Sequence, residues 1–389
     1  MIDWALLILV LVAIAIGFAL GRRSSYLPED ADEPSLQPHY IQGLNYLLNE
    51  QPDAAIDSFI DNLAVNSETL ETHLALGNLL RKRGEVGRAI KIHQNLLARP
   101  GLGAEQSRQV QLELSRDFIK SGLLDRAEML LKELVATATP AERVLCIEYL
   151  IEIYREEKEW QAGIEMINKL PSRRFSRLPD EWRAVQSHFY CELAEEALKR
   201  SDYLTARRHI REASLAHKQS ARASLLQADL DYRLGQYKEA IKVLKHVYYQ
   251  DSALLPEALP LLTTCHRALG SIPQLRHYLN ELLEYRASIP VVLALTELIV
   301  REEGAETAAA FLSTHAAHSP SLKVAEMMLS LQLASYDSPP EGMVMADKIV
   351  RRLQKAAPQY RCNSCGFAGQ KMHWLCPSCK TWGSIKPVE

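Results

Sequence analysis

The feature that most constrains the fold of this chain is a sequence pattern that returns about every 34 residues. Small residues recur at that spacing in three pairs: Gly43 and Gly77, Ala55 and Ala89, and Ala206 and Ala240. The sequences around these residues also align, since GLNYLLNEQPDAAIDSF matches GNLLRKRGEVGRAIKIH. A segment of this length cannot bury its own apolar face, so the copies must stack on one another. The repeat therefore excludes a single globular core for the middle of the chain.

Each copy contains the residues that two packed antiparallel helices require. Small side chains at one position allow the helices to approach closely: Ala55, Ala89, Ala127, Ala162, Ala206 and Ala240. Glycines occur where the first helix should end in a left-handed residue: Gly84, Gly122 and Gly235. The pattern resembles the tetratricopeptide repeat, a helix–turn–helix of this length. The resemblance implies an all-α superhelix of about nine repeats between residues 39 and 355.

In such a superhelix the first helices line a groove that usually holds another protein or peptide. The register of the repeats places five side chains in this groove, namely Asn78, Arg81, Arg116, Asp229 and Tyr232. An ordinary solvated helix face is the simpler interpretation of each one. The sequence therefore predicts a partner-binding surface and no defined site on it.

The N-terminus contains 17 residues without a charge, from 4 to 20. As a helix this run would reach roughly 25 Å, close to the thickness of a bilayer core. The alternative is a cleaved signal peptide, which needs basic residues before the apolar run, whereas Arg22 and Arg23 follow it. We expect residues 1–21 to be a single-pass membrane anchor, with the N-terminus facing out and the body on the cytoplasmic side.

Residues 22–38 should form a tether, because they contain three prolines and several acidic side chains and little that can pack. Within the anchor, Ala13, Gly17 and Gly21 recur every four residues, which would let a second helix approach closely. A homodimer through this face is one interpretation, although small residues are frequent in membrane helices generally.

Signs of enzymatic chemistry are missing from the sequence. It contains no GxSxG, Walker, HExxH or Rossmann motif. Three isolated cysteines lie on apolar helical stretches, where a thiol usually behaves as a small apolar side chain: Cys146, Cys191 and Cys265. The formal net charge of −3 argues against a protein with a uniformly basic, nucleic-acid-binding surface. We expect no enzyme and no nucleic-acid partner.

The most specific local motif is a pair of CxxC sequences near the C-terminus: Cys362 with Cys365, and Cys376 with Cys379. Two such pairs can form a tetrahedral site of four thiolates, which suits one ion of zinc or iron. Gly366 and Pro377 provide the turns. Two disulfides and a redox-active CxxC are the competing interpretations, and a reducing compartment and the paired spacing disfavour them. Residues 356–389 are therefore predicted to be a metal-binding module.

This segment is too short to bury a core of its own, so the metal should supply its folding free energy. Its apolar side chains are predicted to dock on the last repeats: Trp374, Trp382, Phe367 and Ile385. The end of the chain is also basic, with eight Lys or Arg and no acidic residue between Lys348 and Lys386. It could attract an acidic protein, anionic lipid or nucleic acid, and a membrane tether favours the first two.

The order of an anchor, repeats and the ending YRCNSCGF…WLCPSCKTWGSIKP is similar to that of the lipopolysaccharide assembly protein B (LapB/YciM) family of Gram-negative bacteria. The resemblance extends over essentially the whole chain, including NYLLNEQPDAAIDSF, RGEVGRAIKIHQ and HFYCELA. It implies a rubredoxin-like module whose ligands are the four cysteines named above.

The same resemblance implies a regulator of lipopolysaccharide biosynthesis. Family members promote degradation of the deacetylase LpxC by the membrane protease FtsH and help to organise lipopolysaccharide-synthesis proteins at the inner membrane. Two other functions remain open: a passive assembly scaffold for envelope enzymes, and a redox or metal-sensing protein.

Overall fold

The computed structural model describes residues 69–171, 178–316 and 321–388, together with a few isolated residues before them. The predicted anchor, tether and first repeat therefore lie almost entirely outside the described residues. Within the described part of the chain, no helix combines the length and the apolar character needed to cross a bilayer.

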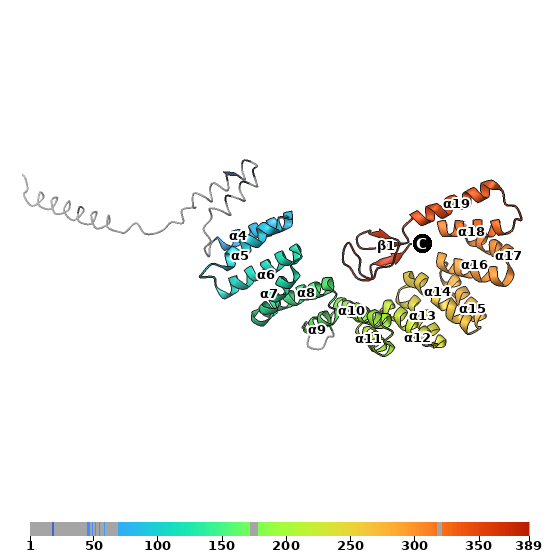
Figure 1. The fold of residues 1–389 in the computed structure, drawn as a ribbon, viewed down its shortest axis with the longest axis horizontal. Coiled ribbons are helices and arrows are strands. Elements are labelled where there is room, and N and C mark those ends of the chain that lie inside the picture. Colours follow the sequence, from blue (N-terminus) through green and yellow to red (C-terminus); the bar gives the residue numbers. More distant parts are fainter. Residues whose placement is uncertain are drawn as a thin grey trace, which may run out of the picture. The chain divides into compact units, whose positions relative to one another are not determined.

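The chain divides into two compact units, residues 1–138 and 139–389. In the described residues the helices follow one another as antiparallel pairs, and each is labelled in Figure 1. Unit 1 contains α4 (Leu70–Arg83), α5 (Val86–Leu97), α6 (Ala104–Ser121) and α7 (Leu124–Thr137). Unit 2 contains α8 (Pro140–Glu157), α9 (Trp160–Asn168), α10 (Asp180–Lys199), α11 (Tyr203–Ala216), α12 (Ala221–Arg233), α13 (Tyr237–Gln250), η1 (Ser252–Leu254), α14 (Leu255–Ala268), α15 (Ile272–Tyr285), α16 (Ile289–Glu303), α17 (Ala305–Ala316), α18 (Leu322–Ala334) and α19 (Glu341–Ala356).

The predicted left-handed glycines end the first helices. Gly84 follows α4 with a φ of 89°, and Gly122 follows α6 with a φ of 77°. The Gly84 N–H donates to the carbonyls of Leu80 and Arg81, which satisfies the last turn of the helix. A residue with a Cβ would be strained in this conformation, so the glycine spacing predicted these turns correctly.

The predicted small side chains lie where the two helices of a pair touch. Ala89, Ala127, Ala206 and Ala240 are all fully buried, each as the fourth residue of its helix. In α9 that place is taken by Gly163 and not by Ala162, so the sequence register was wrong by one residue there. The reason is steric, because a Cβ on Gly163 would lie 2.3 Å from the ring of Phe189.

The C-terminal module begins after α19 and contains a small antiparallel sheet. Its strands are β1 (Tyr360–Cys362), β2 (Ala368–Gly369) and β3 (Ile385–Pro387), in the order β2–β1–β3. Cys362 of β1 is paired with Ile385 of β3. Within unit 2, the module lies on the inner side of the arc that the helices form (Figure 1).

Candidate metal centre and its docking surface

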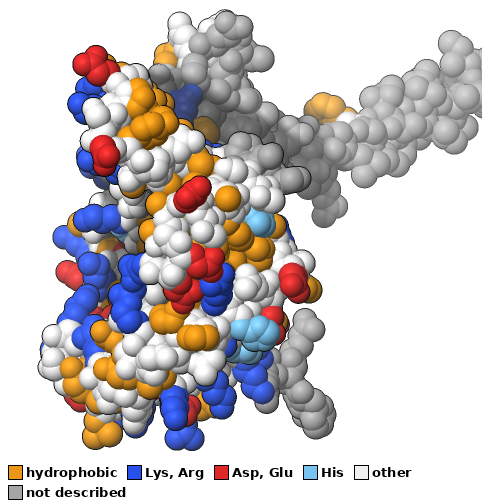
Figure 2. All heavy atoms as spheres, turned by 90° about the vertical axis from the view of Figure 1, so that its right-hand side faces the viewer, with side chains coloured by type: hydrophobic (Ala, Val, Ile, Leu, Met, Phe, Trp, Pro, Cys, Tyr) orange, Lys and Arg blue, Asp and Glu red, His pale blue; other side chains and the backbone are white. Residues whose placement is uncertain are grey.

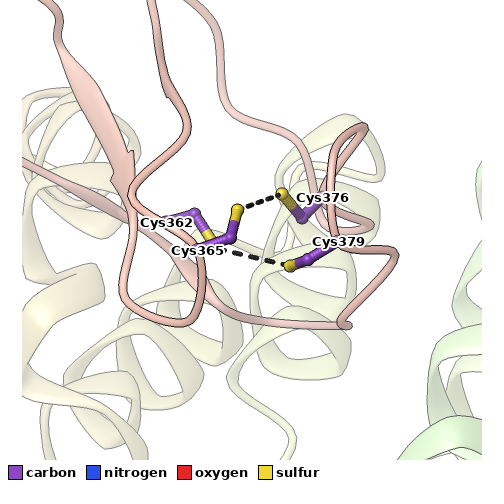
Figure 3. A group of neighbouring side chains, drawn as sticks. All are labelled: Cys362, Cys365, Cys376 and Cys379. Carbon is purple, nitrogen blue, oxygen red and sulfur yellow. Dashed lines mark hydrogen bonds between the residues drawn. The ribbon is translucent and has the colours of Figure 1, made fainter. Parts of the chain in front are cut away.

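The four cysteines of the two CxxC motifs converge in the module. Their sulfur atoms all lie within 4.8 Å of one another. Two pairs, Cys362 with Cys379 and Cys365 with Cys376, have Sγ–Sγ distances of 3.7 Å, and Figure 3 shows the side chains pointing toward a common centre. A metal–sulfur bond of about 2.3 Å gives a tetrahedron with an edge of about 3.8 Å. The geometry therefore fits one tetrahedral ion, with zinc and iron both suited to it.

Two similar turns bring the cysteines together. In the first, the Gly366 N–H donates to the carbonyl of Cys362 at 3.0 Å. In the second, the Lys380 N–H donates to the carbonyl of Cys376 at 2.9 Å. The residue after each second cysteine is left-handed, with φ of 78° at Gly366 and 57° at Lys380. Sequence reasoning identified Gly366 and missed Lys380, because a lysine gives no signal for this conformation.

Hydroxyl groups next to the sulfurs favour thiolates. The Thr381 hydroxyl is 3.3 Å from the Cys379 sulfur and lowers the pKa of that thiol to about 6. The Ser384 hydroxyl lies 3.2 Å from the Cys362 sulfur and also lowers its pKa. Burial instead raises the pKa of Cys376 to about 11. A bound cation would favour deprotonation of this thiol as well, because metal ligation needs the thiolate.

The module has a small apolar cluster of its own. Ile385 is buried together with Cys362 and Cys376, and Phe367 packs against them. Phe367 and Ile385, which were predicted to dock on the repeats, belong to this cluster within the module. Trp374 and Trp382 do dock, although on the middle of unit 2 as well as on its later helices.

The centre of the docking surface is aromatic. Trp382 stacks on His188 of α10, with ring centroids 4.8 Å apart and an angle of 14° between the planes. Its edge meets Phe189 and Trp160 at centroid distances of 6.0 and 6.1 Å. Burial, together with the nearby positive charge of Arg222, lowers the pKa of His188 to about 3. The imidazole in this stack is therefore neutral at physiological pH.

Arg222 of α12 lies under both tryptophans. Its guanidinium carbon is 5.4 Å from the ring centroid of Trp374 and 5.8 Å from that of Trp382. The same guanidinium donates to Glu192 at 2.8 Å and to Glu195 at 2.6 Å, both on α10. The side chain of Arg222 is only 2% exposed. Arg222 therefore joins two helices and the module through ion pairs and cation–π contacts.

Polar contacts surround this centre. Lys380 donates to Glu156 of α8 at 2.8 Å, and Tyr360 donates to Glu257 of α14 at 2.8 Å. Lys386 forms an ion pair with Asp251, and Lys323 of α18 donates to the carbonyl of Val388 at 2.9 Å. The module is therefore attached to helices along much of unit 2.

A hollow of about 620 Å³ opens beside the module. Residues from α8, α10 and the module line it, among them Tyr149, Glu152, Trp182, His188, Lys380 and Trp382. Because Trp382 forms part of the wall, the shape of the hollow depends on the docked module.

The five predicted groove residues take part in contacts within the fold. Arg81 of α4 donates to Glu113 and Asp117 of α6 and to Asn78, while Arg116 donates to the same Glu113. These contacts bring Asn78, Arg81 and Arg116 into one network. In unit 2, Asp229 pairs with Arg233 on the same helix, and Tyr232 lies 5.7 Å from Tyr237 between ring centroids. Partner binding by these residues stays a prediction.

The three isolated cysteines are buried free thiols, as the sequence predicted: Cys146, Cys191 and Cys265. Burial raises the pKa of Cys146 to about 11 and that of Cys191 to about 12. Neither thiol is a nucleophile at neutral pH.

Comparison with known proteins places these features in a family. Residues 360–387 match the rubredoxin metal binding domain, and residues 191–253 match the tetratricopeptide repeat. The chain is 33% identical to lipopolysaccharide assembly protein B of Escherichia coli K12 over 385 residues, which is 98% of this chain and 97% of that protein. The corresponding Haemophilus influenzae protein is 33% identical over 393 residues, with 98% of each chain covered.

Among solved structures, a tetratricopeptide repeat protein from Parabacteroides merdae aligns with 69% of this chain and 100% of its own, at 13% identity and a TM-score of 0.34. The alignments with these two relatives extend over nearly the whole of each chain, so they include the repeats and the four-cysteine module of this chain. The chain belongs to the lipopolysaccharide assembly protein B family.

Proposed function

We propose that this protein is an inner-membrane-anchored adaptor that promotes degradation of an LpxC-type deacetylase by an FtsH-type membrane protease. In this role it also helps to organise lipopolysaccharide-synthesis proteins at the membrane. The name of its relatives, lipopolysaccharide assembly protein B, supports a place in envelope biogenesis. The resemblance in sequence order supports the more specific adaptor role.

The observation that carries the proposal is the attachment of the metal module to the helices of unit 2. The cation–π and stacking contacts of Arg222 and His188 hold the module against α12 and α10. The module supplies part of the wall of the hollow beside Trp382, so the shape of this surface depends on docking. An adaptor needs such a preformed surface, because ordering a mobile one on binding lowers affinity.

The described polar clusters support a role without chemistry of its own. Arg81, Arg222 and their carboxylates are engaged in ion pairs between helices. The buried thiols have raised pKa values. The metal would have a structural role, since four protein ligands leave no open position for a substrate.

The anchor is tested by deleting residues 1–21. Because the adaptor must meet a membrane protease, the deletion should lengthen the half-life of the deacetylase in cells. The measurement is a chase after protein synthesis is stopped, with the level of the shortened chain matched to that of the full chain. Unchanged turnover of the deacetylase would contradict the proposal.

The module is tested by affinity purification from membranes with Cys376→Ser and a matched control, Cys146→Ala. The first removes a ligand, and the second removes a buried thiol outside the metal site. Recovery of protease and deacetylase should fall for the first variant only. Equal recovery from both variants would show that the docked module is not needed for partner binding.

A passive assembly scaffold is the second candidate, and the word assembly in the relatives' name favours it. It predicts several envelope enzymes in the purification and no change in the half-life of any of them. The half-life measurement therefore separates the two candidates.

A further inference from the structure

Helix α19, the last helix before the module, exposes an apolar stripe. Met345, Ile349 and Leu353 are 59%, 51% and 53% exposed. They are spaced by four residues, so they lie on one face of the helix. No residue of α19 is buried, although the helix packs on α18 and Arg351 pairs with Glu326 there. A solenoid usually ends in a helix with a polar outer face, so this stripe is unexpected.

The basic residues at the end of the chain fall into two groups. Three of the eight form ion pairs within the fold: Arg351, Lys380 and Lys386. The other five are exposed and form no ion pair with any described residue: Lys348, Arg352, Lys355, Arg361 and Lys371. Three of the basic residues therefore stabilise the fold through ion pairs, and five remain available to bind a partner.

Three of the five available cations, Lys348, Arg352 and Lys355, lie on the same helix as the apolar stripe. Lys348 follows Met345 by three residues, and Arg352 follows Ile349 by three, and residues at this spacing are neighbours on a helix surface. Gln370 donates to the carbonyl of Ala357 at 2.8 Å, which brings the segment containing Lys371 to the C-terminal end of α19. Figure 2, which views the end of unit 2 where α17–α19 lie, shows apolar side chains among basic ones.

The charge decides between the occupants that could cover such a face. A second copy of the chain would bring two sets of unpaired cations together, and like charges repel. An apolar stripe flanked by Lys and Arg is instead the pattern of a helix that lies in the plane of a membrane surface. The uncharged run of residues 4–20 supplies a means of keeping the chain at a bilayer.

We propose that α19 lies on an anionic lipid surface, with Met345, Ile349 and Leu353 entering the headgroup region and Lys348, Arg352 and Lys355 contacting lipid phosphates. This proposal rests on the membrane placement proposed above. It adds a second contact to the bilayer, which would orient unit 2 at the surface. The cytoplasmic leaflet is the negatively charged one, in agreement with the predicted topology.

The test uses the full chain reconstituted in nanodiscs, either of phosphatidylcholine alone or of phosphatidylcholine mixed with phosphatidylglycerol. Hydrogen exchange is measured peptide by peptide. The amides of α19 should exchange about tenfold more slowly in the anionic discs, because lipid contact suppresses local opening. The amides of α11 provide an internal reference.

Two variants complete the test. Ile349→Glu places a charge in the stripe and should abolish the slower exchange in anionic discs. The control, Leu204→Glu, changes another apolar side chain that is 83% exposed, on α11, and should leave α19 protected. Unchanged metal content would confirm that the module is intact in both variants.

Equal exchange of α19 in the two kinds of disc would overturn the proposal, and so would protection that rises with protein concentration in detergent, which would indicate a second copy. A chain that does not stay with the discs would contradict the membrane placement itself. If the chain stays with the discs while α19 remains unprotected, only the proposal for α19 is contradicted.

Discussion

Arg81 in unit 1 and Arg222 in unit 2 occupy similar places and serve different purposes. Each guanidinium joins neighbouring first helices through two carboxylates, Arg81 through Glu113 and Asp117 and Arg222 through Glu192 and Glu195. Each pair of helices is thereby fixed by a polar contact as well as by apolar packing.

The difference lies in what covers the two arginines. Trp374 and Trp382 of the module lie over Arg222. Arg81 is 15% exposed, and behind it the fully buried Asp117 lies 2.5 Å from His93. In unit 2 the arginine with its two carboxylates therefore forms part of the docking surface for the metal module. In unit 1 the same arrangement is continued by a buried hydrogen bond between Asp117 and His93.

The largest expected effect is loss of the metal. Cys376→Ser, or a chelator, should remove a binding free energy on the order of 10 kcal/mol from the module, which then unfolds. The cover over Arg222 is lost, so tryptophan emission should shift to the red and the melting temperature of unit 2 should fall. Cys146→Ala should retain the metal. Unchanged melting after metal removal would show that the module only touches unit 2.

The second prediction compares Arg222→Ala with Arg81→Ala. Removing Arg222 should destabilise unit 2 by about 3 kcal/mol, the lower end of the range for a broken buried pair, because Glu192 and Glu195 stay partly hydrated. Hydrogen exchange should show faster opening of the module in this variant alone. If Arg81→Ala loosened the module equally, the contrast between the two arginines would be wrong.

A third prediction concerns the network behind Arg81. A Cβ on Gly77 would lie 2.4 Å from the His93 ring, which is held against Asp117. Gly77→Ala should therefore cost about 2–3 kcal/mol through overpacking. On the neighbouring helix, a Cβ on Gly87 meets no atom within 4 Å, and Gly87→Ala should gain about 0.5 kcal/mol. Local exchange in α4–α6 measures both; equal effects would mean that His93 can move aside.

The smallest expected loss of stability is a pH dependence in unit 2. Burial lowers the pKa of His188 to about 3 in the folded protein, against 6.5 when unfolded. Below pH 6.5 the unfolded chain binds the extra proton, so stability falls as the pH drops toward 3. Between pH 7 and pH 5 the loss is about 2 kcal/mol.

His188→Gln should remove the contribution of His188 to the pH dependence. The contributions of the thiolates and of His209, His217 and His266, whose pKa values burial also lowers, should stay in place. The difference between the two proteins in denaturant unfolding at the two pH values isolates the histidine. Parallel pH profiles for the two proteins would mean that His188 is not neutralised by docking.

The positions of the turns and of the four ligands could be predicted from the sequence, and particular residues show why. Gly84 and Gly122 act within one helix turn, and each CxxC motif places its cysteines in a single tight turn. The predicted repeat register was wrong by one residue at Ala162 and Gly163. The residue that requires a glycine at position 163 is Phe189, which lies on the next helix. A local pattern cannot contain that information.

The sequence by itself determined a repeat of helix pairs, a metal site of four cysteines and a basic C-terminal end, because each depends on spacing along the chain. Only the tertiary structure decided that Trp382 stacks on His188, that Arg222 supports the module, and which basic residues beside the stripe of α19 form no ion pair with a described residue. These contacts join residues far apart in sequence. Their free energies come from burial and charge pairing that exist only once the helices have stacked.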